Sequence, residues 1–381
     1  MSKVRLGDVA KEHKETCKGD KSDYPIVGLE HLEPECITLS QWSESTDNTF
    51  SKVFRKGHVL FGRRRAYLKK AAVAPFDGIC SGDITVIEAI PGRIIPELLP
   101  FVIQNDALFD FAVGRSAGSL SPRVKWEHLK NYEFELPASV EEQRKLADVL
   151  WSIEQTRKSY NSLLRATDEL VKSQFIELFG QVRATAFPVR KLREFATIKH
   201  GFAFKGEFFS YVDNHIVLVT PGNFKIGGGF QENECRFYTG AYPNEYILAP
   251  GSLIVTMTDL SKEADTLGYA ALIPEDSSRL YLHNQRIGLV ELSPELSKSY
   301  VFHYMRTDEY RRRIVATSTG STVHHTSPNR ILDSDIMVPP ISLQMTFEKF
   351  AQQLDKSKFE LEQALSELTL TYKRILAENL G

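Results

Sequence analysis

The chain has 381 residues, of which 42% are hydrophobic and 25% are charged, values ordinary for a globular protein of two or three domains. Its formal net charge of −2 excludes a uniformly basic nucleic-acid-binding protein, so such a function would depend on how charge is distributed. Its four cysteines form no Cys-x-x-Cys pair, which argues against a disulfide framework and a zinc ribbon.

The N-terminal segment leads into an amphipathic stretch without the apolar core of a signal peptide. No apolar run in the chain approaches the roughly 20 residues that a membrane span needs. We therefore expect a cytoplasmic protein that does not contact a membrane.

Short motifs of the first half recur in the same order in the second half, which predicts an internal duplication. The paired segments are 5–10 and 191–196, 56–60 and 250–254, 116–119 and 318–321, and 135–137 and 337–339. Apolar or alternating runs separated by Gly- and Pro-containing stretches predict strands in both halves, at 59–61, 84–88, 253–258 and 287–292. Helical patterns near 96–113 and 297–315 come just before small, polar loops.

Two longer patterns, 146–178 and 343–375, have core positions spaced alternately four and three residues apart, as in coiled coils. Polar residues such as Arg157 and Gln174 occupy some of these positions, so neither helix can form a strong zipper alone. The pattern predicts two helices that pack on each other in antiparallel orientation. Gly180 follows the first helix as a predicted C-cap.

Residues 52–76 contain eight Lys and Arg side chains and no acidic residue. Phosphate neutralisation needs a local cationic surface, and the guanidinium fork of Arg matches guanine edges in the major groove. From this stretch we predict that DNA is contacted by Arg63, Arg64, Arg65 and Lys69. The alternative is a solvated strand face with a few salt bridges.

The loops at 114–125 and 311–330 occupy equivalent places in the two halves, and neither contains an acidic residue. Gly and Ser let a backbone approach DNA, and the polar side chains offer partners for phosphate and base edges. The predicted DNA contacts are Arg115, Ser119, Arg123 and Lys125 in the first loop, and Arg311, Arg312, Thr322, His324, Asn329 and Arg330 in the second. The alternative for either loop alone is a plain connection.

A hydrolase is the competing enzymatic interpretation, because residues 114–118 fit the G-x-S-x-G nucleophile pattern around Ser116. The pattern follows a helical segment where a strand is required, and it is broken in the second half. His324 and His325 lack a ligand partner at metal-binding spacing, and the glycines at 227–229 are not followed by a phosphate-binding Lys. We therefore expect no catalytic residue and no metal site.

The order and duplication of these motifs resemble the specificity subunit of type I restriction-modification systems. The resemblance covers essentially the full length. It is carried by residues 135–137, 141–144, 174–180 and 191–192, and in the second half by 223–224, 251–254, 256–259 and 284–286. The second helix starts Ile-Ser-Leu-Gln where the first has Val-Glu-Glu-Gln, so the two helix starts are not identical.

The resemblance implies an α+β fold with two globular mixed target-recognition domains, 1–139 and 183–340. It also implies a central long helix at 140–182 and a C-terminal long helix at 341–381, paired as antiparallel coiled-coil helices that separate the domains with pseudo-twofold duplication. Glu142, Gln143 and Gln344 are the predicted partner-binding residues.

The implied function is a non-catalytic subunit that reads a split target in double-stranded DNA. Its implied partners are two methyltransferase subunits and restriction/translocase subunits. The chain itself would hold no cofactor, because S-adenosylmethionine and ATP would bind to those partners. About 37 helical residues span about 55 Å at roughly 1.5 Å each, so the helices would fix the unread gap.

The two recognition domains differ in sequence outside the shared motifs, which predicts two unlike half-sites. The alternative to a restriction-modification subunit is a stand-alone DNA-binding regulator or defence decoy that needs no methyltransferase.

Overall fold

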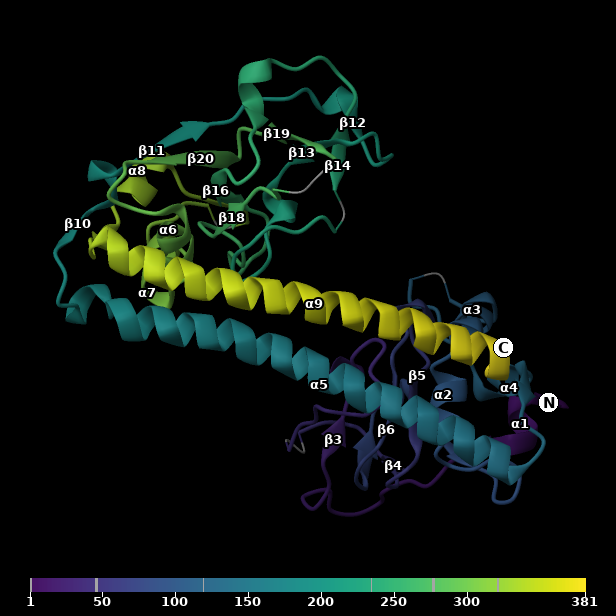
Figure 1. Ribbon diagram of the computed structural model, residues 1–381. Helices are drawn as coiled ribbons and strands as arrows, with labels where there is room; N and C mark the ends of the chain where they lie inside the picture. The colour runs from purple at the N-terminus through teal and green to yellow at the C-terminus, as the bar shows by residue number, and fades with distance from the viewer. Residues whose placement is uncertain (1, 45–46, 119, 234, 276–277, 321) are drawn as a thin grey trace. The chain divides into compact units, whose positions relative to one another are not determined.

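The computed structural model describes residues 2–44, 47–118, 120–233, 235–275, 278–320 and 322–381 (Figure 1). The chain forms two compact units: unit 1 contains residues 1–163 and 360–381, and unit 2 contains residues 164–359. Each unit therefore combines one globular region with a part of each long helix. In the described residues, no helix has the length and apolarity needed to cross a membrane.

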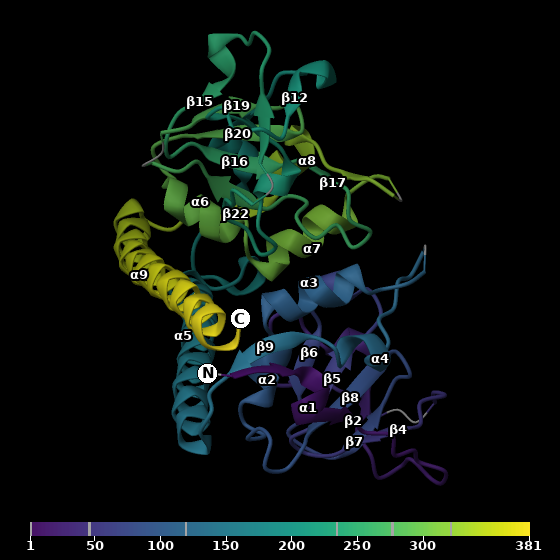
Figure 2. The same cartoon turned by 90° about the vertical axis from the view of Figure 1, so that its right-hand side faces the viewer.

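Unit 1 is built on two small sheets, with strand orders β2-β8-β5-β6 and β3-β7-β4, and on the antiparallel pair β1-β9. Helix α2 contacts β5 and β6 (Figure 2). The elements are β1 Ser2–Arg5, α1 Leu6–Val9, β2 Ala10–Glu12, β3 Ile26–Val27, η1 Leu29–His31, β4 Lys52–Phe54, β5 Val59–Gly62, η2 Ala66–Leu68, β6 Ala71–Val73, β7 Gly78–Cys80, β8 Ile84–Ala89, α2 Leu99–Ile103, α3 Asp106–Gly114, α4 Trp126–Leu129 and β9 Glu133–Leu136.

Unit 2 repeats this plan with a four-stranded sheet ordered β11-β20-β16-β18, a larger second sheet ordered β12-β14-β13-β19-β15, and the pairs β10-β22 and β17-β21. Its strands are β10 Val189–Lys191, β11 Ala196–His200, β12 Phe209–Ser210, β13 Ile216–Val219, β14 Arg236–Tyr238, β15 Ile247–Leu248, β16 Leu253–Thr256, β17 Thr258–Asp259, β18 Ala270–Leu272, β19 Leu280–His283, β20 Ile287–Leu292, β21 His324–His325 and β22 Asp335–Met337. Its helices are η3 Val182–Ala184, η4 Leu192–Glu194, η5 Gly206–Phe208, η6 Pro221–Asn223, η7 Asn244–Tyr246, α6 Lys298–Tyr304, α7 Asp308–Ala316 and α8 Pro328–Leu332.

The duplication predicted from the sequence is confirmed by the strand pairing. In both units a first strand pairs antiparallel with the strand that precedes a long helix, as β1 does with β9 and β10 with β22. In both, one strand of the second sheet pairs in parallel with a neighbouring strand, as β3 does with β7 and β13 with β19. The two globular regions therefore share one topology.

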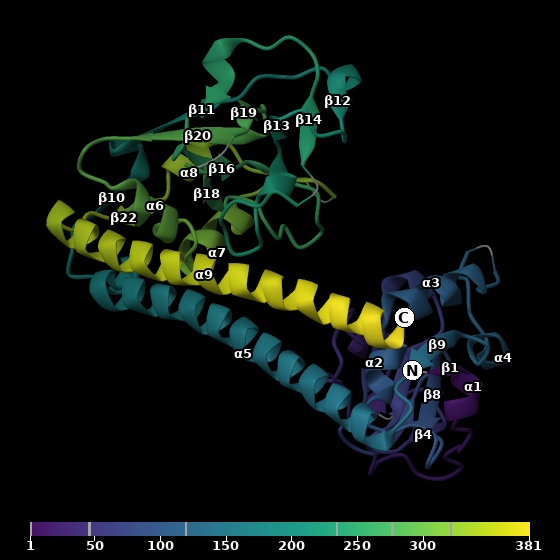
Figure 3. The ribbon, with the colours of Figure 1, turned by 45° about the vertical axis from the view of Figure 1, so that its right-hand side comes forward.

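The long helices are α5 Val140–Phe179 and α9 Ile341–Leu380, and they pair within each unit (Figure 3). In unit 1 the guanidinium of Arg157 lies 5.4 Å from the ring centroid of Tyr372. In unit 2 the Lys358 Nζ lies 2.5 Å from Asp168 Oδ1. Partner numbers fall along α9 as they rise along α5, so the predicted antiparallel coiled-coil pairing is confirmed.

The helix ends are anchored in the cores of the globular regions. The last turns of α9 bury Tyr372, Leu376 and Leu380 in the main core of unit 1. The last turns of α5 bury Phe175 and Phe179 in the main core of unit 2. Burial of large apolar side chains contributes about 1.5–3 kcal/mol each, so these turns are integral to the two cores.

The predicted C-cap of α5 is also confirmed. Gly180 has φ +76°, and its N–H donates to the carbonyl of Ile176 at 2.8 Å. A side chain is disfavoured in this left-handed conformation, which explains the glycine.

Candidate nucleic-acid interface

The two basic stretches predicted in unit 1 lie side by side, although about 50 residues separate them in the sequence. Immediately after β5, the N–H of Arg65 donates to the carbonyl of Pro122 at 2.8 Å, and Arg64 and Arg123 form an antiparallel bridge. The fold thus brings the predicted residues of the two stretches onto one surface. We call residues 117–123 the first hairpin.

The first hairpin replaces the open loop expected from the sequence. Ala117 and Arg123 exchange two backbone hydrogen bonds of 3.0 Å, and Gly118 has φ +117° at the turn. Leu120 near the tip is 91% exposed. The predicted contact Ser119 lies outside the described residues.

The charge of this surface is lower than the sequence suggests, because Asp83 reaches it from the start of β8. Arg123 donates from Nε to Asp83 Oδ1 at 2.7 Å, and Arg64 NH1 lies 3.5 Å from Asp83 Oδ2. The hydrogen bond from Arg123 lowers the pKa of the Asp83 carboxyl. Arg64 also donates from Nε to Ser121 Oγ at 2.5 Å. These two arginines therefore hold the first hairpin in place. They form the salt bridges that the alternative to DNA contact expected.

The remaining predicted cations of unit 1 differ in their exposure and in whether they form ion pairs with other residues of the chain. Lys69 Nζ lies 2.5 Å from Asp106 Oδ1, and Arg63 is half-buried. Arg65, Arg115 and Lys125 are exposed, and none of the three has an ion pair within the described part of the chain. These three side chains are therefore the most available for phosphate or base contacts.

Unit 2 has a corresponding hairpin, which lies beside the segment that follows the equivalent strand β16. We call residues 319–325 the second hairpin; Thr319 and His325 exchange backbone hydrogen bonds of 2.8 and 3.0 Å. It pairs with β17, and the side chains of Thr258 and His325 are in contact, with Oγ1 and Nδ1 3.2 Å apart. Thr258 and His325 thus occupy the places of Arg64 and Arg123 in unit 1. The two predicted loops therefore lie at equivalent places in the two units, each beside the segment that follows β5 or β16.

Arg311, a predicted DNA contact, has a structural role within unit 2. Its guanidinium donates to the carbonyls of Ala264 and Leu267 and lies 4.4 Å from the ring centroid of Tyr269. It therefore holds the 259–268 segment in place with two of its five N–H donors, and the side chain is half-buried.

The other predicted residues of unit 2 remain on its surface to different degrees. Arg312, Thr322 and Asn329 are exposed. His324 is half-buried with Nε2 3.0 Å from the carbonyl of Lys262, and Arg330 donates to Thr319 Oγ1 at 3.3 Å. Unit 2 thus presents hydroxyl, amide and imidazole groups beside two arginines, Arg312 and Arg330.

Gln143 and Gln344, which were predicted to bind a partner, are buried and bond to backbone groups of this chain. Gln143 accepts from the N–H of Ile95 at 3.1 Å and donates to the carbonyl of Pro137 at 3.0 Å. Both side chains tie the start of a long helix to a loop of the neighbouring globular region. Sequence reasoning detected the repeated glutamine and missed that its partners are backbone groups.

Glu142 is exposed and takes part in a capping box at the start of α5. Its carboxylate accepts from the N–H of Ser139 at 3.2 Å, and Ser139 Oγ accepts from the N–H of Glu142 at 3.1 Å. The hydrogen bond from the Ser139 backbone lowers the pKa of Glu142. This pattern satisfies backbone donors that a helix start leaves open, so Glu142 has a structural role whether or not a partner also binds it.

Ser116 has none of the features of a hydrolase nucleophile. Its Oγ donates to the carbonyl of Ala112 at 2.8 Å, at the end of α3. A nucleophile elbow joins a strand to a helix and leaves the hydroxyl free, so the motif match is coincidental.

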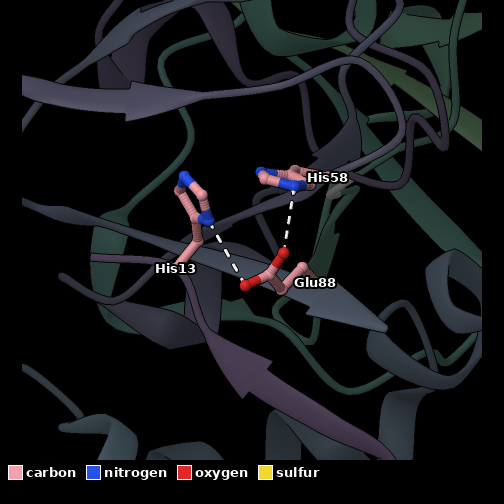
Figure 4. A group of neighbouring side chains, drawn as sticks. All are labelled: His13, His58 and Glu88. Carbon is pink, nitrogen blue, oxygen red and sulfur yellow. Dashed lines mark hydrogen bonds and ion pairs between the residues drawn. The ribbon is translucent and has the colours of Figure 1, made fainter. Parts of the chain in front are cut away.

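A cluster of His13, His58 and Glu88 was missed by the sequence analysis, because its members come from three separate segments around β2, β5 and β8 (Figure 4). His13 Nδ1 lies 3.3 Å from Glu88 Oε1, and His58 Nε2 lies 3.5 Å from Glu88 Oε2. The N–H of Arg55 donates to His58 Nδ1 at 3.1 Å, which places the proton of neutral His58 on Nε2. Burial lowers the pKa of His58 and favours that neutral form.

A metal ion would need the Nε2 lone pair of His58, which this tautomer does not offer. Lys11 Nζ also lies 3.3 Å from Glu88 Oε1. The cluster is therefore a hydrogen-bonded network that joins adjacent strands.

The first part of the chain matches a known family of DNA specificity domains. Residues 1–165 match the family model described as "Type I restriction modification DNA specificity domain". Over 173 residues, the chain is 26% identical to the type I restriction enzyme EcoBI specificity subunit of Escherichia coli, a match that covers 44% of this chain. The family model therefore matches a DNA specificity domain within the first 165 residues, which is less than half of the chain. The match spans about a third of the length of that relative, 33%.

Two solved structures share the fold over nearly the whole chain. The S subunit of a type I restriction-modification system from M. genitalium has a TM-score of 0.61 at 12% identity, covering 100% of this chain and 96% of the other. A second structure, described as addressing complex assembly and conformational transition of the type I R-M system, has a TM-score of 0.55 at 18% identity. The match covers 99% of this chain and 97% of the other. These likenesses confirm the predicted fold class.

Proposed function

We propose that this chain is a type I specificity subunit and reads a split target in double-stranded DNA, one half-site with each unit. The observation that supports it most is the repeated placement of a hairpin beside the strand end after β5 and after β16. Arg64 and Arg123 form this contact in unit 1, and Thr258 and His325 form it in unit 2. One architecture with different side chains is suited to reading two different base sequences, so the target should be asymmetric.

The chemistry of each surface supports such a role. Exposed Arg65, Arg115 and Lys125 can neutralise phosphates, and Arg can also reach guanine edges in the major groove. Exposed Asn329 in unit 2 can read adenine through its amide. Phosphate contacts set the register of a protein on DNA, and side chains that reach base edges determine the sequence.

The catalytic partners would dock on the long helices. The exposed large apolar residues of α5 and α9 are Val140, Val149, Leu163, Leu170, Ile176, Ile341, Met345, Phe359 and Leu370. Apolar side chains on a helix exterior are a common feature of protein docking surfaces. We propose two methyltransferase subunits as the partners, with S-adenosylmethionine bound to them, and ATP-dependent restriction/translocase subunits in a restricting complex.

The unread gap in the target would be set by the helices. Each helix is continuous over 40 residues, about 60 Å at 1.5 Å per residue. Deletion of about one heptad from both helices should shorten the gap between the two methylated half-sites. An unchanged gap in the deletion variant would contradict this part of the proposal.

Co-purification and DNA binding test the function as a whole. The full chain, co-expressed with the methyltransferase of the same system, should form a complex that binds its methylated motif more tightly than a scrambled duplex. Arg115→Glu should weaken binding to both duplexes, whereas Lys349→Glu on α9 serves as a charge-matched control. A chain that binds specific DNA alone and captures no methyltransferase would instead be a stand-alone regulator or decoy.

A further inference from the structure

We infer that Tyr67 contacts the bases of the half-site read by unit 1, and that the turn at residues 65–69 holds it in position to do so. This inference rests on the proposed DNA-reading function. Tyr67 lies at the centre of the one-turn helix η2 Ala66–Leu68, directly after the basic triplet 63–65. Its side chain is 55% exposed, while its neighbour Ala66 is buried in the main core.

The backbone of this turn adopts a conformation that side chains disfavour. Arg65 has φ 53° and Lys69 has φ 51°, so both ends of η2 are in the left-handed region. Glycine adopts this region freely, whereas a Cβ atom makes it unfavourable. The chain nevertheless keeps two cationic side chains there. Strained positions of this kind concentrate where a functional surface requires both the backbone shape and the side chain.

The turn is fixed to its surroundings at both ends. The N–H of Arg65 donates to the carbonyl of Pro122 in the first hairpin at 2.8 Å. At the other end, Lys69 Nζ lies 2.5 Å from Asp106 Oδ1 in the first turn of α3. Within the turn, the N–H of Leu68 donates to the carbonyl of Arg65 at 2.9 Å. Tyr67 is therefore presented from a pre-organised backbone, which lowers the entropy cost of binding.

The chemistry of a tyrosine differs from that of the cations around it. Arg65, Arg115 and Lys125 gain most from phosphate charge, which is the same at every base pair. A phenol ring offers a flat apolar face that can pack against a thymine methyl or a base, and a hydroxyl that can donate to or accept from a base edge. Tyr67 is thus suited to sequence discrimination.

The duplication supplies a second argument. The segment after β16 in unit 2 corresponds to this turn, and it also exposes a large apolar residue, Leu260, two residues after Thr258, whereas Tyr67 lies three residues after Arg64. Corresponding segments that expose different apolar side chains are what two unlike half-sites require.

The test uses the complete complex with its methyltransferase, and two duplexes: the motif identified by methylation and a scrambled sequence. Tyr67→Ala should weaken motif binding by about 5- to 30-fold, leaving scrambled-duplex binding and the salt dependence unchanged. Lys125→Ala is the matched control and should weaken binding to both duplexes alike. Tyr67→Phe separates the ring from the hydroxyl: retained discrimination assigns the contact to the ring, and lost discrimination to the hydroxyl.

Folding is monitored by the thermal midpoint, which should stay unchanged because the ring is more than half exposed. Tyr67→Lys provides a second variant, expected to strengthen scrambled-duplex binding and still lose discrimination. An unaltered ratio of motif to scrambled affinity in Tyr67→Ala and Tyr67→Lys would overturn the inference. Wild-type complex that fails to discriminate would instead overturn the proposed function, so the two failures are distinguishable.

Discussion

The side-chain carbonyl of Gln344 accepts a 2.8 Å hydrogen bond from the backbone N–H of Ser297, the N-cap of α6. The amide of Gln344 also donates to the carbonyls of Glu295 and Pro339 at 2.9 Å each. Gln143 makes the corresponding bridge in unit 1, so each long helix is joined to its globular region by one buried glutamine.

Gln344→Ala should therefore destabilise unit 2. Removal of the Gln344 side-chain amide leaves three backbone groups without a partner. Each buried unsatisfied group costs about 1–3 kcal/mol before relaxation. We expect the free energy of unfolding, measured with urea, to fall by about 2–4 kcal/mol. Gln352→Ala, an exposed position on the same helix, is the control and should change stability by less than about 0.5 kcal/mol. Equal stability of the two variants would show that the bridge is unimportant.

Asp83→Asn should change DNA binding in two opposite ways. Loss of the carboxylate frees Arg123 and Arg64, so affinity for scrambled DNA should rise and the salt dependence should steepen. The first hairpin loses its anchor, so the ratio of motif to scrambled affinity should fall. Asp77→Asn removes the same charge beside Arg55 and is the control. If both variants change DNA binding equally, the effect comes from net charge alone, and Asp83 does not position the first hairpin.

His303 should make unit 2 sensitive to acid. Burial lowers the pKa of His303 to about 3, assisted by the charges of Arg306 and Lys358. Because the unfolded chain has a histidine pKa near 6.5, the stability contribution is complete above about pH 6.5. It is lost as the pH falls toward 3, at up to about 1.4 kcal/mol per pH unit.

His303→Leu should flatten this dependence. Urea unfolding at pH 7 and pH 4.5 should show a smaller difference in the free energy of unfolding for the variant than for the wild type. His325→Leu, an exposed position, serves as the control. The same acid sensitivity in His303→Leu and the wild type would assign the effect to other groups.

Arg65→Gly should be more stable than Arg65→Ala, although glycine usually destabilises a folded chain. Both variants remove the charge, but only glycine relieves the left-handed conformation, worth roughly 1–2 kcal/mol. The greater freedom of glycine in the unfolded chain offsets about 0.5–1 kcal/mol of that gain. Thermal and urea unfolding should thus rank glycine above alanine. The reverse order would show that the turn is not strained.

The fold was predictable from the sequence where local pattern and burial agree. The run at 59–61 became β5, and the helix expected after Pro137 begins at Val140, because both have strong periodicity and clear end signals. The duplicated order of motifs also placed the two hairpins correctly. Periodicity, end signals and repeats are local properties, and the chain preserves them on folding.

The site was less predictable, because its electrostatics depend on distant segments. Residues 52–76 contain no acid, yet Asp83, just before β8, pairs with Arg64 and Asp106 of α3 pairs with Lys69. Likewise, Arg311 belongs to a basic triplet, but the carbonyls it binds come from a segment more than 40 residues earlier. Charge along a sequence shows which residues are cationic; only the fold shows which cations remain free for DNA.

Methylome sequencing of a host that carries this chain and its methyltransferase tests the DNA-reading function most directly. We predict methylation at one bipartite motif, with two unlike half-sites separated by a gap of fixed length, that disappears when the chain is deleted. A palindromic motif would contradict the assignment of different sequences to the two units. Methylation that persists unchanged without the chain would contradict its role in recognition altogether.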